Sequence, residues 1–129
     1  MESGKDNRCE LGRLGEELTC EWLQKHGHII LEKNWRSGHL EIDIITLDGE
    51  GIHFVEVKAR KESIQAPPQD NVNALKQKRL VKAANAYLNS SKMPPIRDTE
   101  CFFDVMAITF QGGSHEFEWI PQAFIPIYT

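Results

Sequence analysis

Apolar residues recur along the chain with two periods, and each period marks a different kind of element. From Leu11 to His26 they return every three or four positions, as on one face of a helix, and Gly27 follows in the position that ends helices. Asn71–Ser90, rich in Lys, Leu and Ala, is a second predicted helix. The segments with β-strand character are His28–Asn34, Leu40–Leu47, Ile52–Arg60, Phe102–Phe110 and Phe117–Ile120. This order predicts an α/β fold with a mixed central sheet between helices.

The segments between these elements are short, and two of them are expected to be loops. Lys61–Asp70 and Ser91–Glu100 each contain a Pro-Pro pair, which interrupts regular secondary structure. No internal repeat, low-complexity tract or long linker divides the chain, and its 129 residues are enough to bury one core. We therefore expect residues 1–129 to form a single domain.

The sequence Asp48-Gly49-Glu50-Gly51 separates two predicted strands and is typical of a hairpin turn. With a loop of either two or four residues, the numbers of opposed residues add up to 99. Large apolar residues then oppose one another, in the pairs Ile42 with Val57, Ile44 with Val55, Ile45 with Phe54 and Leu47 with Ile52. This agreement supports the register.

The same register brings charged residues together on one face of the hairpin. It places Asp43 opposite Glu56 and Glu41 opposite Lys58, with Cβ atoms about 4.5–5.5 Å apart. Two facing carboxylates repel, and a bound divalent cation removes the conflict because Mg²⁺ prefers carboxylate oxygens. Lys58 is then placed to contact a metal-bound water or a substrate phosphate. Such a group can hydrolyse phosphodiesters, since the metal activates water and the lysine positions or deprotonates it.

A cross-strand network of salt bridges is the alternative interpretation of these four residues. This network accounts for Glu41 and Lys58, which would form a salt bridge with each other. It leaves Asp43 and Glu56 without a cation, so we favour the metal site.

Asp43 followed, after twelve residues, by Glu56-Val57-Lys58 resembles the D…ExK signature of restriction-endonuclease-like nucleases. The chain is also similar to the YraN-like family, small uncharacterised bacterial proteins for which an endonuclease activity has been inferred. The similar stretches are residues 11–17, 34–36, 41–45, 54–60, 76–80 with 83–84 and 87–88, and 103–108. This resemblance implies the α/β/α sandwich of the PD-(D/E)xK superfamily, with the site on a β-hairpin. Ile42 stands where the proline of that motif name would be.

In a nuclease of this kind, Asp43, Glu56 and the backbone carbonyl of Val57 would hold Mg²⁺ or Mn²⁺, and Lys58 would activate water. Superfamily members often add a carboxylate from their first helix. The apolar stripe of the first predicted helix points Glu16 away from the core and leaves Glu17 at its border, so Glu17 is the candidate. A solvated helix carboxylate is the alternative for Glu17.

The net charge of −4 hides an uneven distribution. Between Ile52 and Arg97 nine basic residues face three acidic ones, which gives +6, while the rest of the chain carries −10. The negative net charge argues against a protein that coats nucleic acid through its overall charge. The basic segment between Ile52 and Arg97 can still form a local positive surface for an anionic partner. The candidate contacts to nucleic acid, which would be DNA in a nuclease of this class, are Lys58, Arg60, Lys76 and Arg79.

Lys76 falls within the apolar stripe of the second predicted helix. A lysine in that position needs an anionic partner, either in the active site or on a bound phosphate. The alternative is that its aliphatic side chain extends past the end of the helix, so that the ammonium group reaches water. Asp104, in an otherwise apolar strand, is expected to pair with such a basic residue rather than to bind metal.

The remaining residue types exclude several classes of protein. Three widely separated cysteines form neither a disulfide framework nor a zinc motif, and five histidines show no ligand spacing. The polar first ten residues and the absence of a long apolar run predict a cytoplasmic protein without a signal peptide or membrane segment.

The leading hypothesis is a metal-dependent nuclease acting on DNA, of a structure-specific or repair type, because the chain contains no base-reading motif that we recognise. A homodimer would suit an enzyme that cuts both strands. The second hypothesis is a nucleic-acid-binding accessory protein that keeps the fold without useful turnover. A structural interaction protein is the third.

Overall fold

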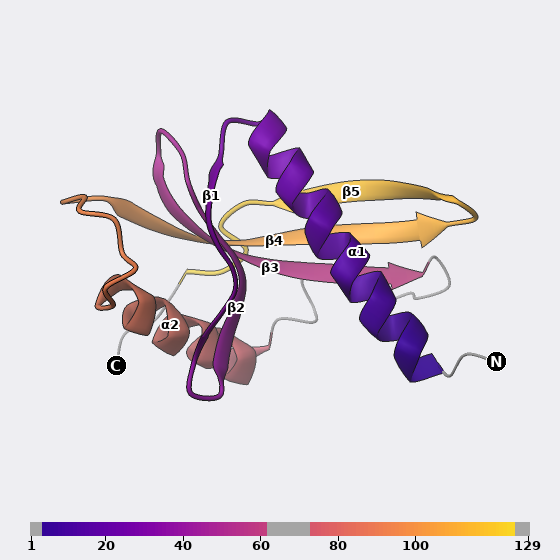
Figure 1. The fold of residues 1–129 in the computed structure, drawn as a ribbon, viewed down its shortest axis with the longest axis horizontal. Coiled ribbons are helices and arrows are strands. Elements are labelled where there is room, and N and C mark those ends of the chain that lie inside the picture. The colour runs from indigo at the N-terminus through magenta and orange to yellow at the C-terminus, as the bar shows by residue number, and fades with distance from the viewer. Residues whose placement is uncertain (1–3, 62–72, 126–129) are drawn as a thin grey trace.

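The computed structural model describes residues 4–61 and 73–125, which form two helices and five strands. In chain order these are α1 (Gly4–Lys25), β1 (Ile29–Ser37), β2 (Leu40–Leu47), β3 (Gly51–Lys61), α2 (Ala74–Leu88), β4 (Glu100–Gln111) and β5 (Ser114–Ile120) (Figure 1). The predicted elements are all present. The start expected for the second helix, Asn71, lies outside the described residues, and Asn73 caps α2 by accepting a 2.9 Å hydrogen bond from the Lys76 N–H.

The five strands form one mixed sheet in the order β1-β2-β3-β4-β5. Neighbouring strands are antiparallel except β3 and β4, which pair in parallel from Gly51–Glu100 to Lys61–Phe110. A parallel pair needs a long crossover, and α2 lies in the segment that makes it. The predicted α/β fold with a mixed sheet is confirmed, and it is consistent with a restriction-endonuclease-like core.

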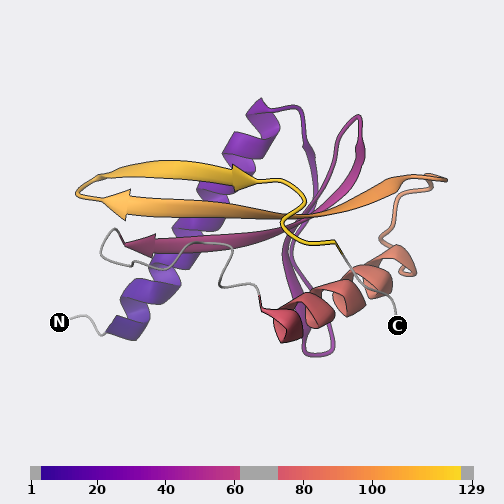
Figure 2. The same ribbon diagram turned by 180° about the vertical axis from the view of Figure 1, so that it is seen from behind.

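The two helices cover opposite faces of the sheet, as the two views show (Figures 1 and 2). Alternation along the strands divides the core in the same way, since Ile44 and Val55 pack on the α1 side and Ile45 and Phe54 on the α2 side. Tyr87, fully buried, anchors α2 to its face. No helix in the described part of the chain is long and apolar enough to cross a membrane.

The buried face of α1 differs from the one that its large apolar residues predict. The fully or largely buried positions are Gly15, Thr19, Cys20 and Leu23, whereas Leu14 is 43% exposed. The reason is close packing: a Cβ added to Gly15 would lie 2.9 Å from the Ala59 Cβ. Small residues let the helix approach β3, and they set its rotation.

The predicted register of the β2–β3 hairpin is confirmed in four pairs, from Leu47–Ile52 to Ile44–Val55. Beyond them the expected pairs of Ile42 with Val57, Asp43 with Glu56 and Glu41 with Lys58 do not form. There β2 continues with β1, through Trp35–Ile42 and Arg36–Glu41, while β3 continues with β4. The two strands therefore separate into a fork that begins at Asp43 and Glu56.

Two glycines of α1 test the close approach of the helix to the sheet. Gly12→Ala should raise the free energy of unfolding by up to about 1 kcal/mol, because alanine favours helix and nothing lies within 4 Å of the added Cβ. Gly15→Ala should lower it by about 1–3 kcal/mol, because its Cβ meets Ala59. Urea unfolding followed by circular dichroism measures both, and equal stabilisation by the two substitutions would contradict this packing.

Candidate active site at the strand fork

The carboxyl groups of Asp43 and Glu56 meet at the fork. The Val57 N–H donates a 2.9 Å hydrogen bond to Asp43 Oδ2. The Asp43 side chain thus replaces the backbone acceptor that β2 would provide if its pairing with β3 continued. A second hydrogen bond joins the Asp43 and Glu56 side chains. Glu56 is only 5% exposed and Asp43 is half-buried. The structure thus brings the two predicted metal ligands together, although not as a cross-strand pair.

Two carboxyl groups can share this space because one of them keeps its proton. Burial, together with the negative charge of Glu56, raises the pKa of Asp43 to about 8. Burial also opposes ionisation of Glu56, but the hydrogen bond from Asp43 and the nearby ammonium groups outweigh it and lower the pKa of Glu56. Near neutral pH, Asp43 therefore keeps its proton and donates a hydrogen bond to the ionised Glu56.

Two lysines contact Glu56 from different elements. Lys76 Nζ, from the first turn of α2, lies 2.9 Å from Glu56 Oε2, and Lys58 Nζ, from β3, lies 3.5 Å from the same oxygen. Burial opposes the charge of Lys76, but its hydrogen bond to Glu56 raises the pKa above the usual value. Lys76 thus has an anionic partner in the candidate site. Lys58 and Lys76 both contact Glu56 Oε2, and the side chains of both lysines are partly exposed.

The helix carboxylate that approaches this site is Glu16 and not Glu17, which corrects the expectation from the helix phase. Glu16 is half-buried and hydrogen-bonded to the Asn34 side chain. Burial, with the charges of Glu41 and Glu56, raises its pKa. Glu17 is exposed and lines a groove with residues that include Cys20 and Lys33. The apolar stripe misled because Leu14 is exposed, while Gly15 and Thr19 are buried against the sheet together with Leu23.

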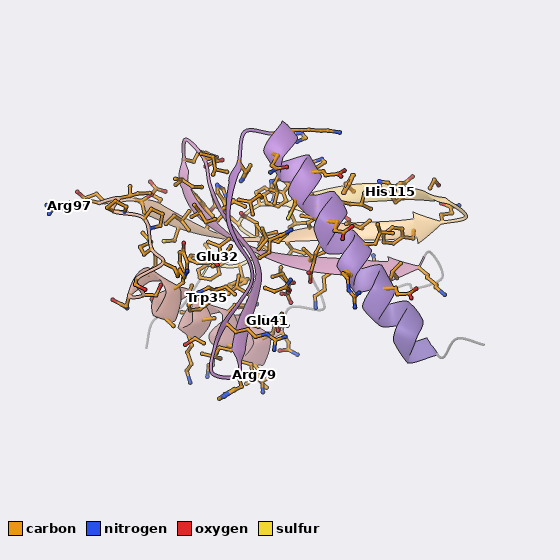
Figure 3. The ribbon with its side chains drawn as sticks, in the orientation of Figure 1. Glu32, Trp35, Glu41, Arg79, Arg97 and His115 are labelled. Atoms are coloured by element: carbon orange, nitrogen blue, oxygen red, sulfur yellow. The ribbon has the colours of Figure 1, made fainter. Side chains whose placement is uncertain are left out.

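The other predicted charged residues lie around the fork. Glu41 pairs with Arg36 at 3.4 Å and not with Lys58, because β2 follows β1 there. Figure 3 shows Glu41 and Arg79 on the same side of the molecule, where the β1–β2 hairpin lies beside α2. Arg79 is exposed, and Arg60 is half-buried on the last part of β3.

A second polar cluster lies at the turn of the β2–β3 hairpin, and the histidine spacing did not reveal it. The possible ligand atoms of His28, Asp48 and His53 all lie within 4.8 Å of one another. His53 is also the partner of Asp104, with Nδ1 2.6 Å from Asp104 Oδ2, so the basic partner expected for Asp104 is a histidine. His53 and Asp104 are each a polar residue within an otherwise apolar strand, and this is the feature of the sequence that could have indicated their contact.

The shared proton predicts a pH-dependent effect of Asp43→Asn. A carboxyl whose folded pKa lies above its unfolded value of about 3.9 gives stability that is complete below that value and is lost as pH rises to about 8. The amide that Asp43→Asn introduces keeps an acceptor for the Val57 N–H and a donor for Glu56 at every pH. In chelator, the variant should match the wild type at about pH 4 and exceed its free energy of unfolding at pH 8 by several kcal/mol, since each unit of pKa difference is worth about 1.4 kcal/mol.

Urea titrations at several pH values measure this difference. The exposed Glu118 on β5 offers a matched control, and Glu118→Gln should leave the pH profile of the wild type unchanged. An Asp43→Asn variant that is less stable than the wild type at pH 8 would rule out the shared proton.

Comparison with known proteins gives one consistent family. The model of an uncharacterised protein family, UPF0102, matches residues 15–108. A UPF0102 protein of Chlorobium chlorochromatii is 45% identical over 125 residues, which cover 92% of this chain and 94% of that protein. UPF0102 proteins of Geobacter metallireducens and Bacteroides thetaiotaomicron are 42% and 36% identical, over 88% and 91% of this chain and 91% and 93% of theirs. The chain belongs to the uncharacterised protein family UPF0102, and its resemblance to the YraN-like proteins is confirmed.

Proposed function

We propose that this protein is a metal-dependent nuclease that hydrolyses phosphodiester bonds in DNA, with its active site at the strand fork. The observation that carries the proposal is the pair of contacting carboxyl groups, Asp43 and Glu56, with two lysine ammonium groups on Glu56. The fork supports this assignment because β2 and β3 no longer pair with each other there, so Asp43 and Glu56 lie at the point where the two strands separate.

The donor set fits a divalent cation. A buried carboxyl that must retain its proton beside another carboxylate is a position where a metal ion can replace that proton. Asp43, Glu56 and the Val57 carbonyl would hold Mg²⁺ or Mn²⁺, since all three supply the oxygen atoms that these ions prefer. Glu16 would assist in the role first assigned to Glu17. The bound ion would lower the pKa of water and neutralise charge that develops on the phosphate.

The lysines have separate tasks in this proposal. Lys58, on the strand that carries Glu56, would position or deprotonate the attacking water. Lys76 lies 2.9 Å from Glu56 and neutralises its charge. With a cation on that carboxylate, the ammonium group of Lys76 would be available for a substrate phosphate. Arg60 and Arg79 would add contacts to the DNA backbone, which orient a substrate but do not read its sequence.

A nucleic-acid-binding protein without turnover is the second candidate. The short ion pair between Lys76 and Glu56 favours it, because an ammonium group already satisfies the carboxylate that the nuclease needs for a metal. The two candidates differ in metal binding and in cleavage, which the following experiments measure separately.

Calorimetric titration with Mn²⁺ tests the metal site. The wild type should bind one ion at the fork, and the double variant Asp43→Ala/Glu56→Ala should lose at least about tenfold in affinity, because both carboxylate ligands are gone. Glu118→Ala removes an exposed carboxylate elsewhere and should bind Mn²⁺ as the wild type does. Equal affinity of wild type and double variant would exclude a metal site at the fork.

A cleavage screen with Mn²⁺ over single-stranded, duplex, flap and four-way-junction DNA tests the reaction. Glu56→Ala and Lys58→Ala should reduce cleavage by at least about 10²-fold, since each removes part of the water-activating group. Lys78→Ala changes an exposed lysine of α2 and should cleave normally. The same panel excludes a contaminating nuclease, whose activity would not follow the variants.

DNA binding in the same samples separates the two candidates. No cleavage by the wild type, combined with salt-sensitive binding that survives Asp43→Ala/Glu56→Ala and is lost in Lys58→Ala, Lys76→Ala and Arg79→Ala, would replace the nuclease with the binding protein.

A further inference from the structure

We propose that His28, Asp48 and His53 form a second metal site, which binds Zn²⁺ or a similar transition-metal ion. It lies at the turn end of the β2–β3 hairpin, whereas the fork begins at the opposite end of the paired region, beyond Ile44 and Val55. The proposal is independent of the nuclease function.

Three separate segments bring the ligands together. His28 precedes β1, Asp48 follows β2, and His53 lies near the start of β3. The pairing of Ile29 with Leu47 places His28 beside Asp48, and the pairing of Thr46 with His53 places His53 next to both. Sheet pairing, rather than a local sequence motif, therefore assembles this cluster.

The distances are close to those that a tetrahedral ion needs. Bond lengths of 2.0–2.2 Å to nitrogen and oxygen put neighbouring ligand atoms about 3.3–3.6 Å apart. His28 Nε2 lies 3.5 Å from Asp48 Oδ2, and His53 Nε2 lies 2.9 Å from Asp48 Oδ1. One ligand atom from each residue lies within 4.8 Å of the others, so binding one ion needs side-chain movements of on the order of 1 Å, and the ion replaces the hydrogen bond between His53 Nε2 and Asp48 Oδ1. The three residues would leave one of four positions for water or another ligand.

The far nitrogen of each ring is already held by an oxygen atom. His28 Nδ1 lies 2.7 Å from Thr46 Oγ1, and His53 Nδ1 lies 2.6 Å from Asp104 Oδ2. Asp104 is itself fixed, since its other oxygen accepts a 2.8 Å hydrogen bond from the Gln122 N–H. Oxygen partners of this kind orient histidine ligands so that Nε2 faces the metal.

The carboxylate is also oriented. Asp48 Oδ1 accepts hydrogen bonds from the N–H groups of Glu50 and Gly51 at 2.9 and 3.2 Å, while Oδ2 is the atom nearest His28. The side chain of Asp48 is 15% exposed, against 7% for each of the two histidines. An ion would therefore enter past Asp48 and be enclosed by the imidazole rings.

The ring environment completes the enclosure. Phe102 stacks on His53 with centroids 4.8 Å apart, and Trp119 meets His28 edge-on at 6.1 Å. Two imidazole nitrogens with one carboxylate oxygen select Zn²⁺, Co²⁺ or Ni²⁺ over Mg²⁺, which prefers oxygen ligands. The chemistry of this cluster therefore differs from that of Asp43 and Glu56 at the fork.

The test is binding of Zn²⁺, and of Co²⁺ as a coloured substitute, to the full chain after chelation. One ion per chain should bind and raise the melting temperature, and Co²⁺ should give the visible absorption of low-coordinate nitrogen and oxygen ligation. His28→Gln and Asp48→Asn should each weaken binding at least about tenfold. The amide of the Asp48→Asn variant keeps an acceptor for the turn N–H groups, so this variant separates loss of the ligand from loss of the fold.

Two controls define the site. His115→Ala removes an exposed histidine and should bind Zn²⁺ normally, as should Asp43→Ala/Glu56→Ala. Loss of Zn²⁺ binding in either control would place the ion elsewhere and overturn the proposal. Stoichiometric binding that is equal in wild type, His28→Gln and Asp48→Asn would overturn it too, as would no binding to the wild type, which would leave the cluster a network of hydrogen bonds and ion pairs.

Discussion

The hydrogen bond from the Val57 N–H to Asp43 Oδ2 is the contact on which the arrangement of the fork depends. A strand that leaves its neighbour exposes backbone donors, and each buried donor without a partner costs about 1–3 kcal/mol. Asp43 supplies a side-chain acceptor at the point where β2 turns away from β3. The two strands can therefore separate. Beyond that point β3 stays paired with β4, and the side chain of Glu56 contacts Lys76 of α2 as well as Asp43.

The rotation of α1 is the second constraint on this site. Because Gly15 approaches Ala59, α1 presents its smallest residues to β3 and brings Glu16 towards the carboxylates of the fork. A helix rotated so as to bury Leu14 would direct a different carboxylate there. The contact between helix and strand thus decides which acidic residue can join the site.

The sequence was a good guide to the elements, the sheet class and the paired part of the hairpin, because periodicity and residue pairing are local properties. It was a poor guide to the fork. Ile42 and Val57 continue the apolar pattern in β2 and β3, but Ile42 packs towards α2 and pairs with Trp35 of β1. A pattern shows that a residue is buried and not which neighbour buries it. The cluster of His28, Asp48 and His53 was not predicted for a related reason: its residues come from three separate segments, so no local motif marks it.

The raised pKa of Asp43 supports the metal site that we propose at the fork. The ammonium groups of Lys58 and Lys76 both lie on Glu56, while the pKa of Asp43 stays raised. In a purely structural network an asparagine would make the same hydrogen bonds without the tendency to ionise, and replacing buried charges often stabilises a protein. A carboxyl at position 43 would be an advantage if a cation, rather than a proton, occupied the space between it and Glu56. The divalent cation that we propose would meet that condition, and the ammonium group of Lys76 would then supply the charge for a substrate phosphate.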